Sequence, residues 1–425
     1  PSLVGSEMGI RDRNRNLHVV REPEDPTDEI IDRIMDELNS EDGRLPDMEE
    51  EIRKRKIKFR RKVILIAAAV IAAVVGVYLL INLQMYSEVR TVDTYGNGKT
   101  ANNGYAQFGD GVLKYSRDGI AYLNQKGEEE WNQSYQIKTP VIDVCEEAAA
   151  VADKGGNDIV VFQEEGTKGE IHTTMPIEKI NVSKQGIVSA ILKGDGITKI
   201  MCYDTAGNVL VEHKTSLSGT GYPLDVTLSS DGETMQVLYL YTQAGSITSK
   251  VVYYNFGKVG EDKADHQVAM ETYENTIMAA GFYMNDSVSV AVGDNCLVIY
   301  QGGDKPKERV KVPIKKEIKS VFHSEKYIGL VLKNAGKEGY ELRLYNTNGK
   351  MVMSKDFTGD YNHVKICGNQ VIMYDGKKCS IFMKNGIQKF EGEMNNNILE
   401  IFPIAGVNKY IVMNANGMEK VRLVK

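Results

Sequence analysis

The sequence has few of the residues that build most catalytic and metal sites. Its 425 residues include one tryptophan, six histidines and five cysteines. The histidines are single and far apart along the chain: His18, His172, His213, His266, His323 and His363. They form neither a HExxH helix nor a closely spaced zinc pair. We therefore predict no metal and no cofactor.

The cysteines are odd in number and contain no CxxC pair. They are Cys145, Cys202, Cys296, Cys367 and Cys379. Most lie inside apolar, strand-like runs, which favours small buried hydrophobic side chains over a disulfide framework. Cys367 and Cys379 are the one close pair, and whether they ever form a disulfide stays open.

Other catalytic signatures are absent as well. The sequence has no G-x-S-x-G elbow and no D-x-D-x-DG calcium loop. The stretch 95–100, YGNGKT, ends like a phosphate-binding loop, but Asp93 stands where the first glycine belongs, so we predict a solvated linker. The carboxylate pairs 146–147 and 164–165 are predicted to be solvated in loops. A site assembled from distant segments would escape this search.

The distribution of charge along the chain bears on whether the protein binds nucleic acid. The formal net charge is -6, with 14 basic and 16 acidic residues in positions 1–62, and 38 basic and 42 acidic residues in the remainder. Because neither part is strongly basic, we do not expect binding to nucleic acid.

What the chain does contain is one long apolar run over residues 63–83, VILIAAAVIAAVVGVYLLINL. A run of this length predicts a transmembrane helix, because about 20 apolar residues cross a bilayer core of roughly 30 Å. A buried core helix or a cleaved signal peptide are the alternatives. A retained anchor is favoured, because the run exceeds a signal-peptide core and no A-x-A cleavage site follows it.

The flanks of the run predict its orientation. Eight of the ten residues before it are basic: Arg53, Lys54, Arg55, Lys56, Lys58, Arg60, Arg61 and Lys62. The positive-inside rule then predicts a single-pass protein of the cell membrane with residues 1–62 in the cytoplasm and residues from about 84 outside. Ala68, Ala72 and Gly76 follow one another at four-residue steps, which permits a homodimer through the helix.

The arm 1–62 holds one predicted helix. Met8 is our candidate for the natural start, and residues 9–26 are predicted to be disordered. Residues 28–38 can form an amphipathic helix capped by Thr27, with one apolar stripe of Ile30, Ile31, Ile34, Met35 and Leu38. The stripe is either a docking face for a cytoplasmic partner or a face that folds back without a role.

From residue 101 onward, short strands alternate with turns, and one pattern repeats. An alternating strand ends in a large apolar residue and is followed by a polar glycine turn, as in the segments 119–128, 199–208, 341–350 and 378–387. Turn glycines are assigned at Gly127, Gly169, Gly207, Gly349 and Gly386, with degenerate turns near Gly257 and Gly303. A period of about 40 to 45 residues with four strands is typical of a β-propeller.

We therefore predict an all-β propeller over residues 105–425, with eight blades and a seven-bladed ring as the alternative. The predicted blades are 105–132, 140–174, 177–213, 223–272, 277–312, 317–356, 361–391 and 397–425. The last blade has sequence for only three strands, so residues 86–94 within the segment 84–104 are predicted to supply the fourth and close the ring.

These repeats resemble the eight-bladed, pyrroloquinoline-quinone-like propeller superfamily, which includes the scaffold lipoprotein BamB. The layout of arm, span and exterior propeller is similar to a domain-of-unknown-function family of Gram-positive single-pass membrane proteins. Quinoprotein dehydrogenases of this superfamily carry tryptophan docking motifs, whereas this chain has only Trp131, which we interpret as a packing residue.

The sequence thus predicts a non-enzymatic module that binds or scaffolds a protein, a peptide or a cell-envelope component. Protein partners are expected on both sides of the membrane. The alternative is an exterior lyase or glycosidase with acidic residues in the propeller channel.

Overall fold

A computed structural model describes residues 28–38, 48–96, 103–216, 219–243 and 245–425. The candidate start Met8, the predicted disorder of residues 9–26 and the predicted cap Thr27 lie outside these residues, as does most of the 95–100 segment. The chain divides into two units, residues 1–81 and 82–425, each described by itself.

Among its described residues, the first unit contains helix α1 (Asp28–Leu38) and all but the last two residues of helix α2 (Met48–Leu83). Helix α1 has the predicted bounds. Helix α2 begins well before the apolar run, so the basic stretch is helical and continuous with it. Lysine and arginine favour helix, which is consistent with this continuity. Over Ile52–Leu79 the helix is long and apolar enough to cross a membrane, and it is compatible with a single span or a signal sequence.

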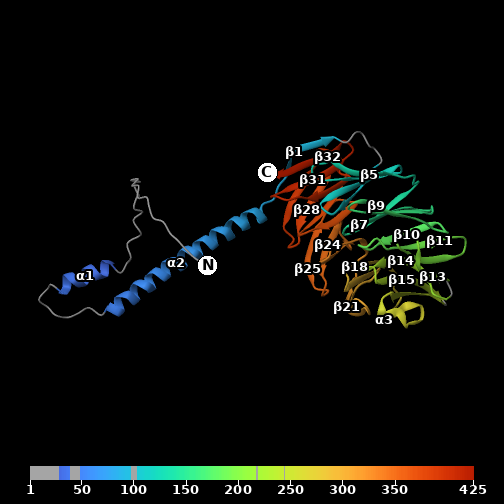
Figure 1. Cartoon of the computed structure of the whole chain (residues 1–425), viewed down its shortest axis with the longest axis horizontal. Coiled ribbons are helices and arrows are strands. Elements are labelled where there is room, and N and C mark those ends of the chain that lie inside the picture. Colours follow the sequence, from blue (N-terminus) through green and yellow to red (C-terminus); the bar gives the residue numbers. More distant parts are fainter. Residues whose placement is uncertain (1–27, 39–47, 97–102, 217–218, 244) are drawn as a thin grey trace, which may run out of the picture. The chain divides into compact units, whose positions relative to one another are not determined.

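The second unit is an eight-bladed β-propeller (Figure 1). Each blade is one antiparallel sheet of four strands, as the sequence predicts. The first blade contains β2 (Gly104–Phe108), β3 (Gly111–Tyr115), β4 (Gly119–Leu123) and β5 (Glu129–Ser134), and the second contains β6 (Pro140–Cys145), β7 (Ala148–Asp153), β8 (Asp158–Gln163) and β9 (Gly166–His172). The third blade contains β10 (Ile177–Val182), β11 (Val188–Lys193), β12 (Thr198–Tyr203) and β13 (Val209–Thr215), and the fourth contains β14 (Tyr222–Leu228), β15 (Thr234–Gln243), β16 (Ser246–Asn255) and β17 (Gln267–Glu274). The next three contain β18 (Met278–Asn285), β19 (Val288–Gly293), β20 (Cys296–Gln301) and β21 (Lys307–Pro313); β22 (Ile318–His323), β23 (Tyr327–Lys333), β24 (Tyr340–Asn346) and β25 (Met351–Phe357); and β26 (His363–Cys367), β27 (Gln370–Asp375), β28 (Lys378–Met383) and β29 (Gln388–Glu393). The last blade contains β30 (Glu400–Pro403), β31 (Lys409–Asn414), β32 (Gly417–Val424) and β1 (Glu88–Gly96). Two short helices, α3 (Lys258–Glu261) and η1 (Ala264–His266), lie between β16 and β17.

The hydrophobic core lies between the blades. Alternate side chains of a strand point to opposite faces of its sheet, so each blade can pack on both of its neighbours. Strand β15 shows this arrangement. Met235, Val237 and Tyr239 pack toward the third blade, whereas Leu238 packs toward the fifth. The eight apolar clusters of the described chain each join one pair of adjacent blades.

The ring closes through the strand that the sequence analysis assigned to this role, shifted by two residues. Strand β1 pairs antiparallel with β32, from Glu88 opposite Val424 to Gly96 opposite Gly417 (Figure 1). Just before β1, Tyr86 is buried, donates its backbone N–H to the carbonyl of Lys389 and forms a parallel bridge with Phe390. The last blade is therefore built from both ends of the propeller sequence.

Every blade has one extra residue in its outermost strand. These bulge residues are Glu130, Lys168, Leu210, Val268, Arg309, Val352 and Lys389 in the first seven blades, and Val92 of β1 in the eighth. A bulge increases the local twist of a strand. The repeated bulge thus twists the exposed edge of each blade relative to its inner strands.

One predicted turn is wrong. Gly169 lies inside β9, opposite Val161, and the turn before that strand ends at Gly166, which has a φ of 112°. Gly169 serves close packing instead, because a Cβ there would lie 1.7 Å from the carbonyl oxygen of Thr205. Both positions need glycine, and the sequence does not show which one forms the turn.

The interpretation of the rare residues is confirmed in two cases. Trp131 packs between the rings of Tyr122 and Phe162, at centroid distances of 6.0 and 5.7 Å. All five cysteines are free thiols, and Cys379 is buried in the core.

Candidate binding site at the centre of the ring

The first strands of the blades surround the centre of the propeller. A cavity of about 740 Å³ lies there, lined by β6, β10, β14, β18 and β22. In an antiparallel meander, the turns after the first and the third strand lie at the same end of the ring. The cavity reaches this end, because its lining includes residues of the turns after β6, β18 and β22.

Polar side chains tie neighbouring blades together along the cavity wall. Asp143 Oδ2 of the second blade accepts hydrogen bonds from Asn181 Nδ2 at 2.9 Å and from the backbone N–H of Val182 at 2.8 Å, both in the third blade. Asn181 Oδ1 accepts the backbone N–H of Leu228 in the fourth blade at 2.6 Å. These bonds hold Asp143 in one position at the cavity.

An ion pair continues this wall. Lys179 Nζ lies 2.6 Å from Asp225 Oδ1, and Asp225 Oδ2 accepts the backbone N–H of Gly281 in the fifth blade at 2.9 Å. Both charged residues directly follow bulges in their first strands. Four blades farther round the ring, Lys365 and Glu400 form a similar pair between the first strands of the seventh and eighth blades. Bulges re-aim side chains, which explains how Lys179 and Asp225 are placed at the cavity.

Burial changes the ionisation of the cavity carboxyls. Protein atoms around Asp143 raise the pKa of its carboxyl to about 7, although the N–H of Val182 and the charge of Lys179 act in the opposite direction. Burial also raises the pKa of Asp225. A carboxyl whose pKa lies near neutrality can gain or lose a proton at physiological pH.

A second cavity of about 1090 Å³ adjoins the first and shares Val144, Glu146, His323, Ser324 and Glu325 with it. It is lined largely by the turns after the first strands of the first, second, sixth and seventh blades. The carboxylates that line the two cavities are Asp110, Asp143, Glu146, Glu147, Glu164, Asp225, Asp286 and Glu325, against the lysines Lys179 and Lys326. The centre of the ring is therefore strongly acidic.

Glu146 occupies an unusual position at this rim. It has a φ of 52°, whereas the equivalent turns of the first and seventh blades have glycine there, Gly109 at 50° and Gly368 at 58°. Its Oε1 accepts the hydroxyl of Ser230 from the fourth blade at 2.5 Å. A residue with a Cβ is strained in this region of backbone space. The protein thus keeps a carboxylate where glycine would be less strained.

Histidine contributes a neutral group. The ring of His323 stacks on Phe282 at 3.9 Å. Although the side chain keeps some exposure to solvent, the protein atoms around it lower the pKa of His323 to about 4, so the ring is uncharged at neutral pH. No group of three or more histidine, cysteine or acidic side chains among the described residues is arranged to hold a metal ion.

The sequence analysis placed acidic residues in the channel only within its alternative function, and it named none of them. It assigned residues 146–147 and 164 to solvated loops, and the structure brings Glu146, Glu147 and Glu164 together with Asp110 and Glu325 at the rim. The sequence does hold one signal for these residues, which is their position: most of them directly follow the first strand of a blade. Their shared surroundings depend on ring closure, which no local pattern encodes.

The predicted docking residues lie elsewhere, on α1. Ile31 and Met35 are 55% and 59% exposed, Ile30 is buried and Ile34 is half-buried. The side chain of Leu38 is outside the described part. The basic residues of 53–62 lie on α2, where Arg55 is half-buried and the others are exposed.

The fold and the central cavity define a β-propeller with an acidic channel mouth. The chain belongs to a family of unknown function, DUF5711, whose model matches residues 82–423. No curated protein matches it in sequence.

Three solved structures are similar to this chain at low sequence identity. BamB from Moraxella catarrhalis is similar at 11% identity and a TM-score of 0.48, over 79% of this chain and 100% of that one. A eukaryotic initiation factor is similar at 12% identity and a TM-score of 0.45, over 70% and 80% of the two chains. The Pan2 WD40 domain of Neurospora crassa is similar at 10% identity and a TM-score of 0.41, over 67% and 87%.

Proposed function

We propose that this protein is a single-pass membrane protein whose propeller lies outside the cell and binds a cationic segment of a partner protein in the central cavity. The observation that carries the proposal is the imbalance of eight acidic residues against two lysines around the two adjoining cavities. The imbalance persists when Asp143 is protonated, Asp225 is paired with Lys179 and Asp286 is paired with Lys184. Clefts lined by one sign of charge concentrate ligands of the other sign. A lysine-rich or arginine-rich segment is the protein chemistry that fits.

The size of the site supports a segment rather than a flat surface. Cavities of about 740 and 1090 Å³ are large enough for several side chains of an extended peptide. The wall is held by hydrogen bonds between blades, so it needs little ordering when a ligand enters. A preorganised site of this kind spends less binding free energy on ordering its own groups.

The test is binding of a fluorescent hexalysine peptide to the full-length chain in a neutral detergent. A triple substitution, Glu146→Gln, Glu147→Gln and Glu325→Gln, should weaken binding about tenfold or more at low salt, because each exposed charge contributes about 0.5 kcal/mol. The matched control, Glu261→Gln, Asp262→Asn and Glu271→Gln, removes three exposed carboxylates from the fourth blade and should leave the affinity within about twofold. Equal losses in both variants would show only nonspecific attraction and would overturn the proposal.

On the cytoplasmic side, we propose that α1 docks a second partner through Ile31 and Met35. Two large apolar side chains left exposed on one short helix are suited to an apolar groove. A photo-crosslinking residue at Met35 should capture a partner in intact cells, and the same residue at Asp36, also exposed, should not. Equal capture at both positions, or none at either, would contradict this role.

A homodimer through Ala68, Ala72 and Gly76 remains a prediction.

The second candidate function is an exterior lyase or glycosidase, and one observation favours it. A carboxyl with a pKa of about 7 inside a cavity is suited to general acid or base catalysis. Asp143→Asn should then abolish cleavage of a polysaccharide substrate. It should weaken hexalysine binding only modestly. No cleavage of any tested cell-envelope polysaccharide would remove the support for this candidate.

A further inference from the structure

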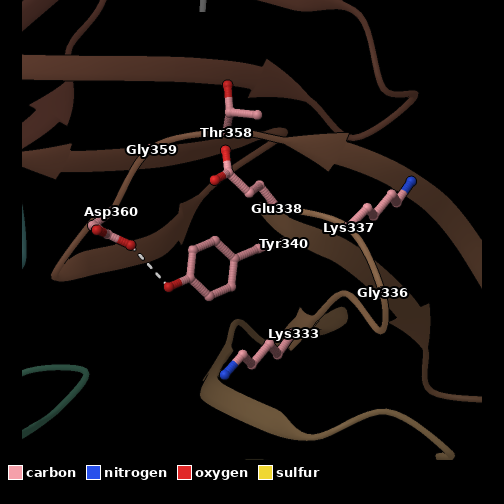
Figure 2. Close-up of a pocket in the computed structure, with 9 residues that line it drawn as sticks. Lys333, Gly336, Lys337, Glu338, Tyr340, Thr358, Gly359 and Asp360 are labelled. Atoms are coloured by element: carbon pink, nitrogen blue, oxygen red, sulfur yellow. Dashed lines mark hydrogen bonds between the residues drawn. The ribbon is translucent and has the colours of Figure 1, made fainter.

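We propose that a second site, on the sixth blade, binds a neutral sugar. A cavity of about 620 Å³ lies between the turn that follows β23 and the segment that follows β25, away from the residues of the central cavities. Figure 2 shows Tyr340 among the side chains of Lys333, Glu338 and Asp360. The proposal concerns a different surface from the proposed cationic-peptide site and does not depend on it.

An aromatic platform forms the first part of the argument. The ring of Tyr340 stacks on Phe357 at a centroid distance of 5.6 Å and an interplanar angle of 27°, and Phe357 lies 6.0 Å from Tyr361. All three rings are only partly buried. An aromatic ring supported from behind offers a flat apolar surface, and the apolar face of a pyranose ring matches such a surface in size and polarity.

The charges around the platform decide the class of ligand. The charged residues of the cavity lining are two lysines, Lys333 and Lys337, and two acids, Glu338 and Asp360. Because Lys337 is also paired with Asp356 at 2.8 Å, these charges give little net attraction to an ion of either sign. A sugar hydroxyl both donates and accepts hydrogen bonds, so a ring of hydroxyls can use the ammonium and the carboxylate groups together.

Asp360 is already oriented for such a bond. The hydroxyl of Tyr340 donates to Asp360 Oδ1 at 2.8 Å, as the dashed line in Figure 2 marks. That contact fixes the carboxylate beside the ring, where it can accept from ligand hydroxyls. Thr358 adds a hydroxyl to the same lining. The cavity thus combines an apolar face with donors and acceptors at its edge.

Glycines shape the two loops. Gly336, Gly339 and Gly359 all have positive φ values, of 74°, 90° and 105°. A Cβ at Gly336 would meet nothing within 4 Å, so this part of the loop is open to a ligand. Backbone without side chains allows close approach of a ligand to the loop.

The experiment is saturation-transfer NMR on the full-length chain in a detergent without a sugar headgroup, with maltotriose and the N-acetylglucosamine trimer as probes. We expect transfer to at least one probe. Tyr340→Ala should reduce its affinity at least tenfold, because it removes the platform, whereas Tyr340→Phe should keep it within about threefold. The matched control Tyr222→Ala, a partly buried tyrosine of the fourth blade, should bind as the unsubstituted chain does.

Two results would overturn the proposal. One is the absence of transfer to either probe at millimolar concentration. The other is unchanged transfer in Tyr340→Ala when circular dichroism shows that the variant is folded. Hexalysine binding should be equal in Tyr340→Ala and the unsubstituted chain, so failure of the sugar site and failure of the central site can be distinguished.

Discussion

At the scale of single residues, Asp143 links the acidity of the cavity to the stability of the fold. Its folded pKa is about 7 and its ordinary value is 3.8, so between these pH values the folded carboxyl holds a proton that the unfolded one has released. The free energy of unfolding should therefore fall as the pH rises from about 4 to 7 and stay level above that range. The ionised form of Asp143 therefore lowers the free energy of unfolding at neutral and alkaline pH.

Asp143→Asn tests this linkage. The amide oxygen can still accept from Asn181 and Val182, but the side chain cannot ionise. We expect the variant to be more stable than the unsubstituted chain by about 4 kcal/mol at pH 8 and nearly equal to it close to pH 4. Urea unfolding at several pH values measures the difference. Parallel pH profiles for the two proteins would contradict the assignment.

Glu146 gives a second prediction at this scale. In Glu146→Gly, the loss of backbone strain offsets the loss of the Ser230 bond and the greater freedom of glycine in the unfolded chain. We expect the free energy of unfolding to change by less than about 0.5 kcal/mol, while hexalysine binding weakens. The equivalent turn of the first blade provides the control. A Cβ at Gly109 would meet only Glu164 Oε1, at 3.8 Å, so Gly109→Ala should cost about 1 kcal/mol through its positive φ. A large loss of stability in Glu146→Gly would show that Glu146 is kept for folding.

At the scale of elements, the sequence predicts the repeated strands and turns, but it does not predict features that depend on a neighbouring strand or blade. The strand and turn pattern predicts the blades closely. Three strands in the last blade predict the closing role of β1, because an unpaired edge there would be unfavourable. The outer-strand bulges are not predictable in this way, because the extra residue, such as Leu210 or Val352, is defined only by its partner strand. The Asp143–Asn181 contact likewise joins residues 38 positions apart in different blades.

The closing strand itself yields a prediction. Strand β1 is largely exposed. Its main contributions to the core are Val89 and Tyr95, and Tyr86, just before the strand, adds a third side chain. A chain that begins at residue 103 would leave the edge of β32 unpaired and those core positions empty. We expect it to lose about 3 kcal/mol or more of stability relative to a chain that begins at residue 84. Thermal unfolding of both chains measures the loss.

A peptide of residues 84–96 provides the control for that experiment. Added in excess, it should raise the melting temperature of the shorter chain, because binding to the folded state alone stabilises it. The same peptide with Tyr86→Ala and Val89→Ala should be less effective, since both side chains pack against the cluster between the last two blades. A shorter chain that is as stable as the longer one would show that ring closure does not need β1.

At the scale of the whole molecule, the remaining question is which side of the membrane holds the propeller. The described helix α2 carries a basic half and an apolar half in one continuous element. Moving the eight basic residues of 53–62 across a bilayer would cost far more free energy than leaving them in the cytoplasm, where the chain is synthesised. The same asymmetry predicts that α1 lies in the cytoplasm and the channel mouth lies outside. The proposed ligands depend on this orientation, because a cell-envelope sugar and an exterior cationic segment are both available only outside.

Cysteine labelling decides the orientation. In a chain with Cys145→Ser and Cys367→Ser, the remaining native thiols are buried, so a new cysteine dominates the reaction. A membrane-impermeant maleimide applied to intact cells should label Lys425→Cys and leave Asp36→Cys, an exposed position of α1, unlabelled, whereas permeabilised cells should show both. Labelling of Asp36→Cys alone in intact cells would place the propeller in the cytoplasm. Because the acidic cavity and the sixth-blade cavity belong to the same unit, such a result would leave their binding chemistry unchanged and exclude both exterior ligands together.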